Sequence, residues 1–211
     1  MTANFDGLAK WYHVLELSTF GVELERARFA HIKSLAECRD ILLLGDGDGR
    51  FLKKLLKVSP NCRVRSIDAS AEMLKMAEKR LSPEQRARVT FECADAMTVD
   101  LPTFAYDGVA TVFFLDCFTD EQAALLIGRV ANALRPGGTW IFADFSIPAS
   151  GPQRIAAHVV TGLLYAFFRW CTRIAARRLP DSEGAITKAG LTPVVSTKFV
   201  FGLLRSVTFR R

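Results

Sequence analysis

A four-residue apolar run that ends in a glycine-rich loop constrains the fold of this chain more than any other feature. The run, Ile41-Leu42-Leu43-Leu44, is too short for a helix and is apolar at successive positions, which is typical of a parallel strand buried on both faces. The loop Gly45-Asp46-Gly47-Asp48-Gly49 then leads into a stretch with helical spacing. A buried strand, a tight turn and a helix predict the first unit of an open α/β sheet.

The middle of the chain repeats this alternation. Expected strands are separated by helical stretches, and Pro136 stops the last of these helices. The strands are expected at 41–44, 64–67, 89–93, 106–114 and 139–145, and the helices at 51–57, 70–81 and 120–134. Right-handed crossovers place such strands in one parallel sheet with helices on both faces. The sequence therefore predicts a doubly wound α/β fold.

Both ends of the chain depart from the alternation. Residues 5–40 show helical spacing that is interrupted at Gly21, which predicts two N-terminal helices. After the fifth expected strand come a long helical stretch, 153–178, and a short one, 182–189. Two final runs predict an antiparallel strand pair at the sheet edge, 193–200 and 203–209. We therefore expect a seven-stranded, mostly parallel sheet.

Composition and cysteine spacing bear on the class and compartment of the chain. Its 211 residues allow one ordinary domain, and 50% hydrophobic residues exclude a disordered protein. No apolar span reaches the roughly 20 residues of a transmembrane helix, and residues 1–10 lack a signal-peptide pattern. The five cysteines are scattered without a Cys-x-x-Cys pair, which favours reduced core thiols. We therefore expect a cytoplasmic protein without a metal site.

The glycine loop and the next strand predict a ligand site. Glycines allow a sharp turn and let a ligand approach main-chain amides, in the crevice at the carboxyl ends of the strands. Asp68 closes the second expected strand, where a carboxylate can accept hydrogen bonds from both ribose hydroxyls. This combination indicates a nucleotide-like ligand. The alternative is a structural turn in which Asp48 caps the following helix.

The acidity of the loop favours one kind of nucleotide. A dinucleotide site has a small residue where this chain has Arg50, and the carboxylates of Asp46 and Asp48 would repel a pyrophosphate. Two anions suit a cationic ligand instead. S-adenosylmethionine carries a sulfonium and an ammonium against one carboxylate, so we expect it in preference to NAD.

Four segments in order resemble the motifs of class I S-adenosylmethionine-dependent methyltransferases: LLLGDGDG, RSIDASAEMLKMA, ECADA and LRPGGTWIFADF. The resemblance covers about residues 5 to 145, and the opening FDGLAKWYHVLELSTFG is similar to the subgroup of quinone-biosynthesis and sterol-type enzymes. It implies a single Rossmann-like domain, 1–211, with an N-terminal helical lid (1–37), a cofactor-binding core (38–146) and a region of substrate-cover helices and terminal strands (147–211). The implied activity is methyl transfer to carbon or oxygen of a small, lipophilic or aromatic acceptor.

The resemblance also implies roles for single residues. The methionine part of the cofactor would lie against Gly45, Asp46, Gly47 and Gly49. Asp68 would bind the ribose, Asp95 would accept from the exocyclic amine of adenine, and Ala96 would donate from its main chain. Ala69 and Met73 would lie near the adenine, and Phe113 and Phe114 would flank the sulfonium. Tyr12 would belong to the lid.

Three positions depart from the family pattern. Leu43 stands where the family usually has an acid, Asp46 replaces a common cysteine, and His13 replaces the aspartate that commonly follows Tyr12 in the subgroup. Asp46 would then either anchor the ammonium of the cofactor or order the loop.

A general base would assist transfer to a hydroxyl or an acidic carbon, although alignment and a dry pocket supply much of the catalysis. The candidates are His13 and Asp116, with His158 as a weaker one.

Residues 154–178 allow two interpretations. Ile155 to Phe168 is largely apolar, and Arg169, Arg173 and Arg177 follow on one helical face. The stretch is either a core helix with a solvated end, or an apolar cover over a lipophilic acceptor whose arginines face an anionic group or a membrane surface.

Two other functions stay open at this point. One is a catalytically silent S-adenosylmethionine-binding module, which Leu43 and the absence of a clear base would fit. The other is a nucleic-acid methyltransferase, suggested by the net charge of +6. Against it, the fourth expected strand is followed by Phe-Phe-Leu-Asp and no recognition domain is added, so we expect no specific nucleic-acid partner.

Overall fold

The computed structural model describes residues 21–148, 161–162 and 178–211. The strands are β1 (Asp40–Leu44), β2 (Arg63–Asp68), β3 (Val89–Cys93), β4 (Tyr106–Val112), β5 (Leu134–Phe145), β6 (Thr192–Phe199) and β7 (Leu204–Arg210). The α-helices are α2 (Gly21–Phe29), α3 (Arg50–Val58), α4 (Ala71–Lys79), α5 (Pro83–Arg86), α6 (Asp120–Ala133) and α8 (Ser182–Lys188). Short 3-10 helices are η1 (Ile32–Leu35), η2 (Leu115–Cys117) and η3 (Val200–Gly202).

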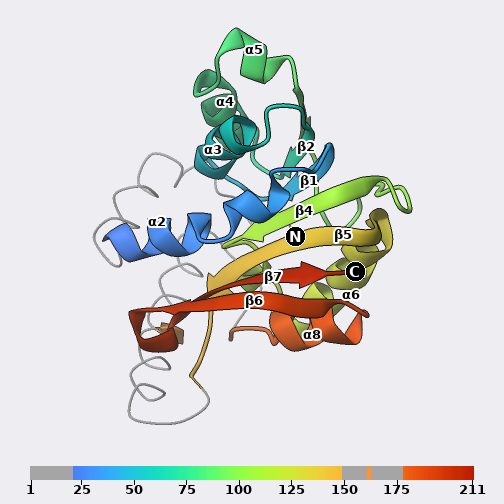
Figure 1. Ribbon diagram of the computed structural model, residues 1–211. Helices are drawn as coiled ribbons and strands as arrows, with labels where there is room; N and C mark the ends of the chain where they lie inside the picture. Colours follow the sequence, from blue (N-terminus) through green and yellow to red (C-terminus); the bar gives the residue numbers. More distant parts are fainter. Residues whose placement is uncertain (1–20, 149–160, 163–177) are drawn as a thin grey trace.

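The strands form one seven-stranded sheet in the order β3-β2-β1-β4-β5-β7-β6. The pairs among β1 to β5 are parallel, whereas β7 runs antiparallel to both β5 and β6. Figure 1 shows β6 and β7 in red along one side of the sheet. The doubly wound sheet with an antiparallel C-terminal pair is confirmed.

The apolar run of β1 is buried on both faces, as its sequence predicts. Leu42 and Leu44 pack in a cluster with side chains of α6 and α8, whereas Ile41 and Leu43 pack in another with α2, η1 and α3. Successive side chains of a strand point to opposite faces, so an unbroken apolar run requires cover on both. α6 and α8 lie side by side in Figure 1 and cover one face of the sheet.

Two strand boundaries differ from the prediction by more than one residue. β5 begins at Leu134 rather than 139, and its register against β4 shifts between the pairs Tyr106–Leu134 and Gly108–Thr139. The Pro-Gly-Gly segment therefore forms an irregular start of the strand instead of a connection before it. β4 ends at Val112 rather than 114, because Phe113 has a φ of 53° and turns the chain out of the sheet.

The described part of the expected lid packs against the sheet. Residues 21–35 form α2 and η1 instead of one continuous helix, and Ala27 and Leu35 are fully buried in the cluster that contains Leu43. This part of the chain therefore belongs to the hydrophobic core. The first expected helix, and most of the stretch 153–178, lie outside the described residues.

The cysteines only partly match the expectation of core thiols. The four described cysteines are unpaired, and Cys62 is buried, but Cys93 is exposed. The expectation is therefore wrong for Cys93. Within the described ranges, none of the helices is long and apolar enough to cross a membrane.

Candidate functional site

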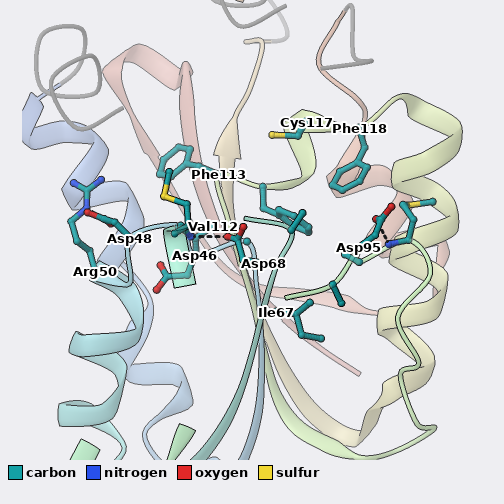
Figure 2. Close-up of a pocket in the computed structure, with 18 of the residues that line it drawn as sticks. Asp46, Asp48, Arg50, Ile67, Asp68, Asp95, Val112, Phe113, Cys117 and Phe118 are labelled. Carbon is teal, nitrogen blue, oxygen red and sulfur yellow. Dashed lines mark hydrogen bonds and ion pairs between the residues drawn. The ribbon is translucent and has the colours of Figure 1, made fainter. Parts of the chain in front are cut away.

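A cleft opens where the parallel strands end. With its open mouth included, its empty volume is about 1170 Å³. The loop after β1, the last residues of β2, the turn after β3 and the segment after β4 all line it. Figure 2 shows Asp48 and Arg50 on one side of the cleft, Asp95 on the other and Asp68 between them.

The structure brings most of the predicted cofactor residues together around this cleft. Those that line it are Gly45, Asp46, Gly47, Asp68, Ala69, Met73, Asp95, Ala96, Phe113 and Phe114. Gly49 and Asp116 are not among the lining residues, although Cys117, next to Asp116, is. Tyr12, His13 and His158 lie outside the described residues.

Gly45 fixes the entry into the loop. Its N–H donates to the carbonyl oxygen of Ile67 at 2.9 Å, its φ is +63°, and a Cβ there would overlap the ring of Phe114. Gly47 also has a positive φ, of +61°, but only the sulfur of Met73, at 3.8 Å, lies near its missing Cβ. The first glycine thus makes room for this chain's own aromatic ring, and the second leaves space in the cleft.

Asp46 points into the start of α3. Its carboxylate accepts from the N–H groups of Phe51 at 3.3 Å and Leu52 at 2.9 Å, and the residue is 6% exposed. These are amides that a helix N-terminus leaves without an intrahelical partner. Burial raises the pKa of Asp46 to about 7, against the opposing effect of the Leu52 hydrogen bond and the charge of Arg28.

Asp48 is held by two cations of this chain. Its carboxylate accepts from Nε of Arg50 at 3.0 Å and pairs with Nη2 of Arg80 at 2.5 Å. It makes no capping hydrogen bond to α3, whose N-cap residue is Gly49. The alternative in which Asp48 caps the helix is therefore wrong.

The electrostatic argument for a cationic ligand is wrong in its premise. Both loop carboxylates are already matched, Asp46 by helix amides and Asp48 by Arg50 and Arg80, so the loop offers no free pair of anions. Of the two roles left open for Asp46, the contacts match the ordering of the loop.

We expect Asp46→Asn to stabilise the protein at pH 8 while having a smaller effect at pH 5. The pKa of the folded state, about 7, lies above the ordinary 3.8, so the carboxyl stabilises the fold at low pH and this contribution is lost as the pH rises toward 7. Removing the ionisation should raise the free energy of unfolding at pH 8 by about 1–3 kcal/mol. Urea denaturation at both pH values measures it.

The matched control for Asp46 is Asp107→Asn. Asp107 also accepts from two backbone N–H groups, those of Arg39 and Asp40, but its side chain is 29% exposed. Its substitution should lower stability similarly at both pH values. A larger loss for Asp46→Asn at pH 8 than at pH 5 would contradict the assigned direction.

Asp68 joins the loop to the next helix and faces the cleft. Its Oδ2 accepts from the N–H of Gly47 at 3.2 Å, and its Oδ1 accepts from the N–H of Ser70 at 2.9 Å. Ser70 caps α4 by accepting from the N–H of Met73, which confirms the predicted cap. A carboxylate has about four acceptor positions, more than these two hydrogen bonds use.

Asp95 organises the turn after β3. Its Oδ1 accepts from the N–H of Met97 at 2.9 Å, and its carbonyl oxygen accepts from Thr98 and Val99. Ala96 is 7% exposed and lines the cleft beside it. The turn thus presents one carboxylate and a small apolar side chain to the cleft.

The sequence analysis missed Arg28 as a site residue. Arg28 is only 4% exposed, lines the cleft, and its guanidinium carbon lies 5.3 Å from the centroid of the Phe113 ring. Glu25 lies 3.7 Å from its Nε. The available signal was an arginine beside Ala27 on the apolar face of the expected helix, where a charge needs a partner. The cleft therefore contains a buried cation.

The end of β5 adds a second residue that the sequence analysis did not single out. Asp144 is 2% exposed, and its Oδ2 accepts from the N–H of Asp116 at 3.1 Å. Burial raises the pKa of Asp116 to about 6, and burial together with the charge of Asp116 raises that of Asp144 further. These two carboxyls lie beside the part of the cleft formed by Cys117.

Comparisons with known sequences agree with the site. A family model described as a methyltransferase domain matches residues 41–138. A demethylmenaquinone methyltransferase of Thermus thermophilus is 31% identical over 149 residues, which is 70% of this chain and 66% of that protein. A demethylmenaquinone methyltransferase of Deinococcus radiodurans is 28% identical, over 70% of this chain and 61% of that protein. The chain thus matches just under two thirds of the length of these relatives.

Solved structures show the same fold. An O-methyltransferase family protein from Burkholderia thailandensis matches 96% of this chain and 59% of its own, with a TM-score of 0.70 and 18% identity. A 1,6-didemethyltoxoflavin-N1-methyltransferase from the same organism, solved with S-adenosylhomocysteine, matches 98% of this chain and 85% of its own, with a TM-score of 0.68 and 18% identity. These structures show the fold, whereas the sequence matches, together with the glycine loop and Asp68, show that the chain belongs to the class I S-adenosylmethionine-dependent methyltransferases.

Proposed function

We propose that this chain binds S-adenosylmethionine in the cleft and transfers its methyl group to carbon or oxygen of a small, lipophilic or aromatic acceptor. The observation that carries the proposal is the convergence of the Gly45 loop, Asp68 and Asp95 on one cleft at the carboxyl ends of the parallel strands. We further propose that 1–211 acts as one domain, with 1–37 as lid, 38–146 as core and 147–211 as substrate cover.

The residues of the cleft fit the chemical groups of this cofactor. Asp68 has acceptor capacity for ribose hydroxyls, Asp95 for an exocyclic amine, and Arg28 provides a buried positive charge for a carboxylate. Apolar side chains between these groups suit the flat adenine and the methyl-bearing sulfur: Ile67, Ala96, Met97, Phe113 and Phe118. Recognition of the cofactor then rests on the separate charges of Asp68, Asp95 and Arg28 along the cleft, and not on the acidity of the glycine loop.

The chain's own contribution to the reaction is alignment and exclusion of water. When bound, S-adenosylmethionine supplies an electrophilic methyl group on sulfur. The ring centroids of Phe113 and Phe145 lie 5.7 Å apart in an edge-to-face arrangement, and Phe113 is 8% exposed. This packing holds one wall of the cleft in place. Holding reacting atoms at near-attack distance can lower a barrier by about 7–11 kcal/mol. Candidate bases for the acceptor remain Asp116 and His13.

The relatives support the acceptor class. The proteins of T. thermophilus and D. radiodurans are named for a demethylated quinone, a lipophilic ring that carries oxygen atoms. We propose an acceptor of this kind for the present chain, with residues 154–178 either covering it or touching a membrane surface.

Two measurements test the proposed function. Calorimetry should show binding of S-adenosylmethionine and S-adenosylhomocysteine and none of NADH. Incubation with hydroxylated naphthalenes and hydroquinones should then release S-adenosylhomocysteine together with a methylated product. Cofactor binding without any product would favour the silent binding module.

We expect Arg28→Met to weaken binding of S-adenosylhomocysteine about tenfold or more, because a charge-assisted pair with the ligand carboxylate is lost. Binding of 5′-methylthioadenosine, which lacks that carboxylate, should change less than threefold. Arg28→Lys should restore part of the affinity. Equal losses for both ligands in calorimetry would mean that Arg28 supports the fold of the cleft and does not contact the carboxylate.

A further inference from the structure

The 3-10 helix η2 is anchored by a buried acid of the neighbouring strand. Asp144, at the end of β5, accepts from the N–H of Asp116 through Oδ2 at 3.1 Å and from the N–H of Phe145 through Oδ1 at 2.9 Å. The side chain is 2% exposed. An acid so deeply buried costs stability unless its hydrogen bonds are made, and here they are made to the turn that carries Asp116. Asp144 therefore fixes the position of Asp116.

The same turn forms part of the cleft wall. Cys117 and Phe118 line the cleft, as do Phe113 and Phe114 at the other end of the turn. Asp116 lies between these lining residues and is partly exposed, and the thiol of Cys117 lies 3.6 Å from its Oδ1. The carboxyl of Asp116, which is not itself among the lining residues, thus lies next to Cys117, which is.

Burial shifts the pKa of both acids upward. Burial raises the pKa of Asp116 to about 6, whereas burial and the charge of Asp116 raise the pKa of Asp144 well above its ordinary range. The thiol of Cys117 keeps its proton, since burial and both acids raise its pKa. With a pKa of about 6, the carboxyl of Asp116 is mainly ionised at neutral pH and can accept a proton.

Other charged groups lie on the neighbouring elements. Asp68, from β2, faces Cys117 and adds to the negative potential. Arg205, opposite Asp144 on β7, is engaged by Glu183 at 2.9 Å and by Ser196 at 3.1 Å.

On the basis of the proposed function, we propose that Asp116 takes the proton of the methyl acceptor and that Asp144 is the residue that positions it. The acceptor is then a hydroxyl or a carbon acid, because a neutral amine already offers a lone pair and needs no base before transfer. This assigns the reaction a base and narrows the acceptor class.

The step balances without any further reagent. The acceptor oxygen or carbon gives its proton to a carboxylate oxygen of Asp116 and uses the released electron pair to bond the methyl carbon. The electron pair of the broken carbon–sulfur bond stays on sulfur, so the products are a methylated acceptor, a neutral thioether and a protonated Asp116. The proton then leaves to solvent.

The variants Asp116→Asn, Asp144→Ala and Asp144→Asn test the proposal, with hydroxylated naphthalenes and primary aromatic amines as acceptor probes. We expect Asp116→Asn to lower kcat about 100-fold or more with the hydroxyl probes, at unchanged affinity for S-adenosylhomocysteine. Asp144→Ala should lower kcat about tenfold, and Asp144→Asn, which keeps a neutral hydrogen-bonding group, should restore much of that loss. Asp107→Asn, at the far end of β4, serves as the unaffected control.

A readout without cofactor separates a base from a merely structural residue. In protein labelled with ¹³C at the aspartate carboxyls, NMR titration should show one group near pH 6 besides that of Asp46 near pH 7. The group near pH 6 should be absent in Asp116→Asn and retained in Asp144→Asn. The kcat/KM profile with the hydroxyl probes should fall below the same pH.

Three results would overturn the proposal: full activity of Asp116→Asn, transfer to amines but not to hydroxyl probes, or no carboxyl titrating near pH 6. In each of these the unsubstituted protein still binds the cofactor. Failure of that protein to bind the cofactor or to methylate any probe would instead overturn the proposed function, and this inference with it.

Discussion

Replacing Gly49 with alanine should lower the free energy of unfolding by about 3 kcal/mol or more, the sum of left-handed backbone strain and overpacking. Gly49 has a φ of +82°, and an added Cβ would lie 2.5 Å from the Cβ of Ala77 and 2.6 Å from its Cα. The obstacle is the backbone of α4, which cannot rotate away as a side chain can. Accommodating the methyl group therefore requires α3 and α4 to separate, and we expect a loss of cooperative unfolding in urea or expression only as insoluble protein.

Gly137→Ala is the matched control for this prediction. Gly137 has a φ of +75°, close to that of Gly49, but open space surrounds the position of a Cβ. Its substitution carries the backbone strain alone and should cost about 1 kcal/mol. If the two variants unfold at the same urea concentration, the contact with Ala77 is not what requires glycine at position 49.

The position of Gly49 also explains why the sequence predicts the glycine loop itself better than the role of each glycine in it. The resemblance assigns the loop glycines to cofactor binding, and the structure places Gly45 and Gly47 at the cleft. Gly49, in contrast, permits the close approach of two helices, with Ala77 twenty-eight residues further along the chain. A pattern of glycines shows that space is needed, but only the tertiary structure shows which neighbour needs it.

The central strand β1 was predictable because it is buried on both faces. Ile41 to Leu44 leaves no polar position for a helix or a one-sided strand, so the sequence alone indicates a central parallel strand. The end of β4 was not predictable in the same way. Phe113 and Phe114 favour a strand by propensity, but the chain leaves the sheet at a φ of 53° and turns into η2. Tertiary packing decides such a boundary.

The charges of the site depend on partners distant in sequence. Asp48 is matched by Arg80, thirty-two residues away, and Arg28 reaches the cleft from a helix that precedes β1. Asp144 meets Asp116 across the ends of two adjacent strands. A sequence shows that these groups are acidic or basic, but not which of them neutralise one another. For this reason the cofactor was expected on an electrostatic argument that the structure overturns, whereas the family resemblance was confirmed.

Asp68→Ala should weaken binding of S-adenosylhomocysteine by about 10- to 100-fold, or about 1–3 kcal/mol, if this carboxylate accepts the ribose hydroxyls. The group is well placed for this, since it ends β2, lines the cleft and is held by the N–H groups of Gly47 and Ser70. Calorimetry at constant pH measures the change. Unaltered affinity in this variant would show that the ribose lies elsewhere.

The same hydrogen bonds complicate a simple interpretation of that loss, because truncating Asp68 also releases the loop from β2. A ligand without ribose hydroxyls separates the two effects. For 2′,3′-dideoxy-S-adenosylhomocysteine, the unsubstituted protein has already lost the hydroxyl contacts, so Asp68→Ala should weaken its binding by less than threefold if the carboxylate acts mainly on the ribose. If both ligands lose affinity equally, Asp68 acts by holding Gly47 in place, and recognition of the ribose must come from other groups of the cleft.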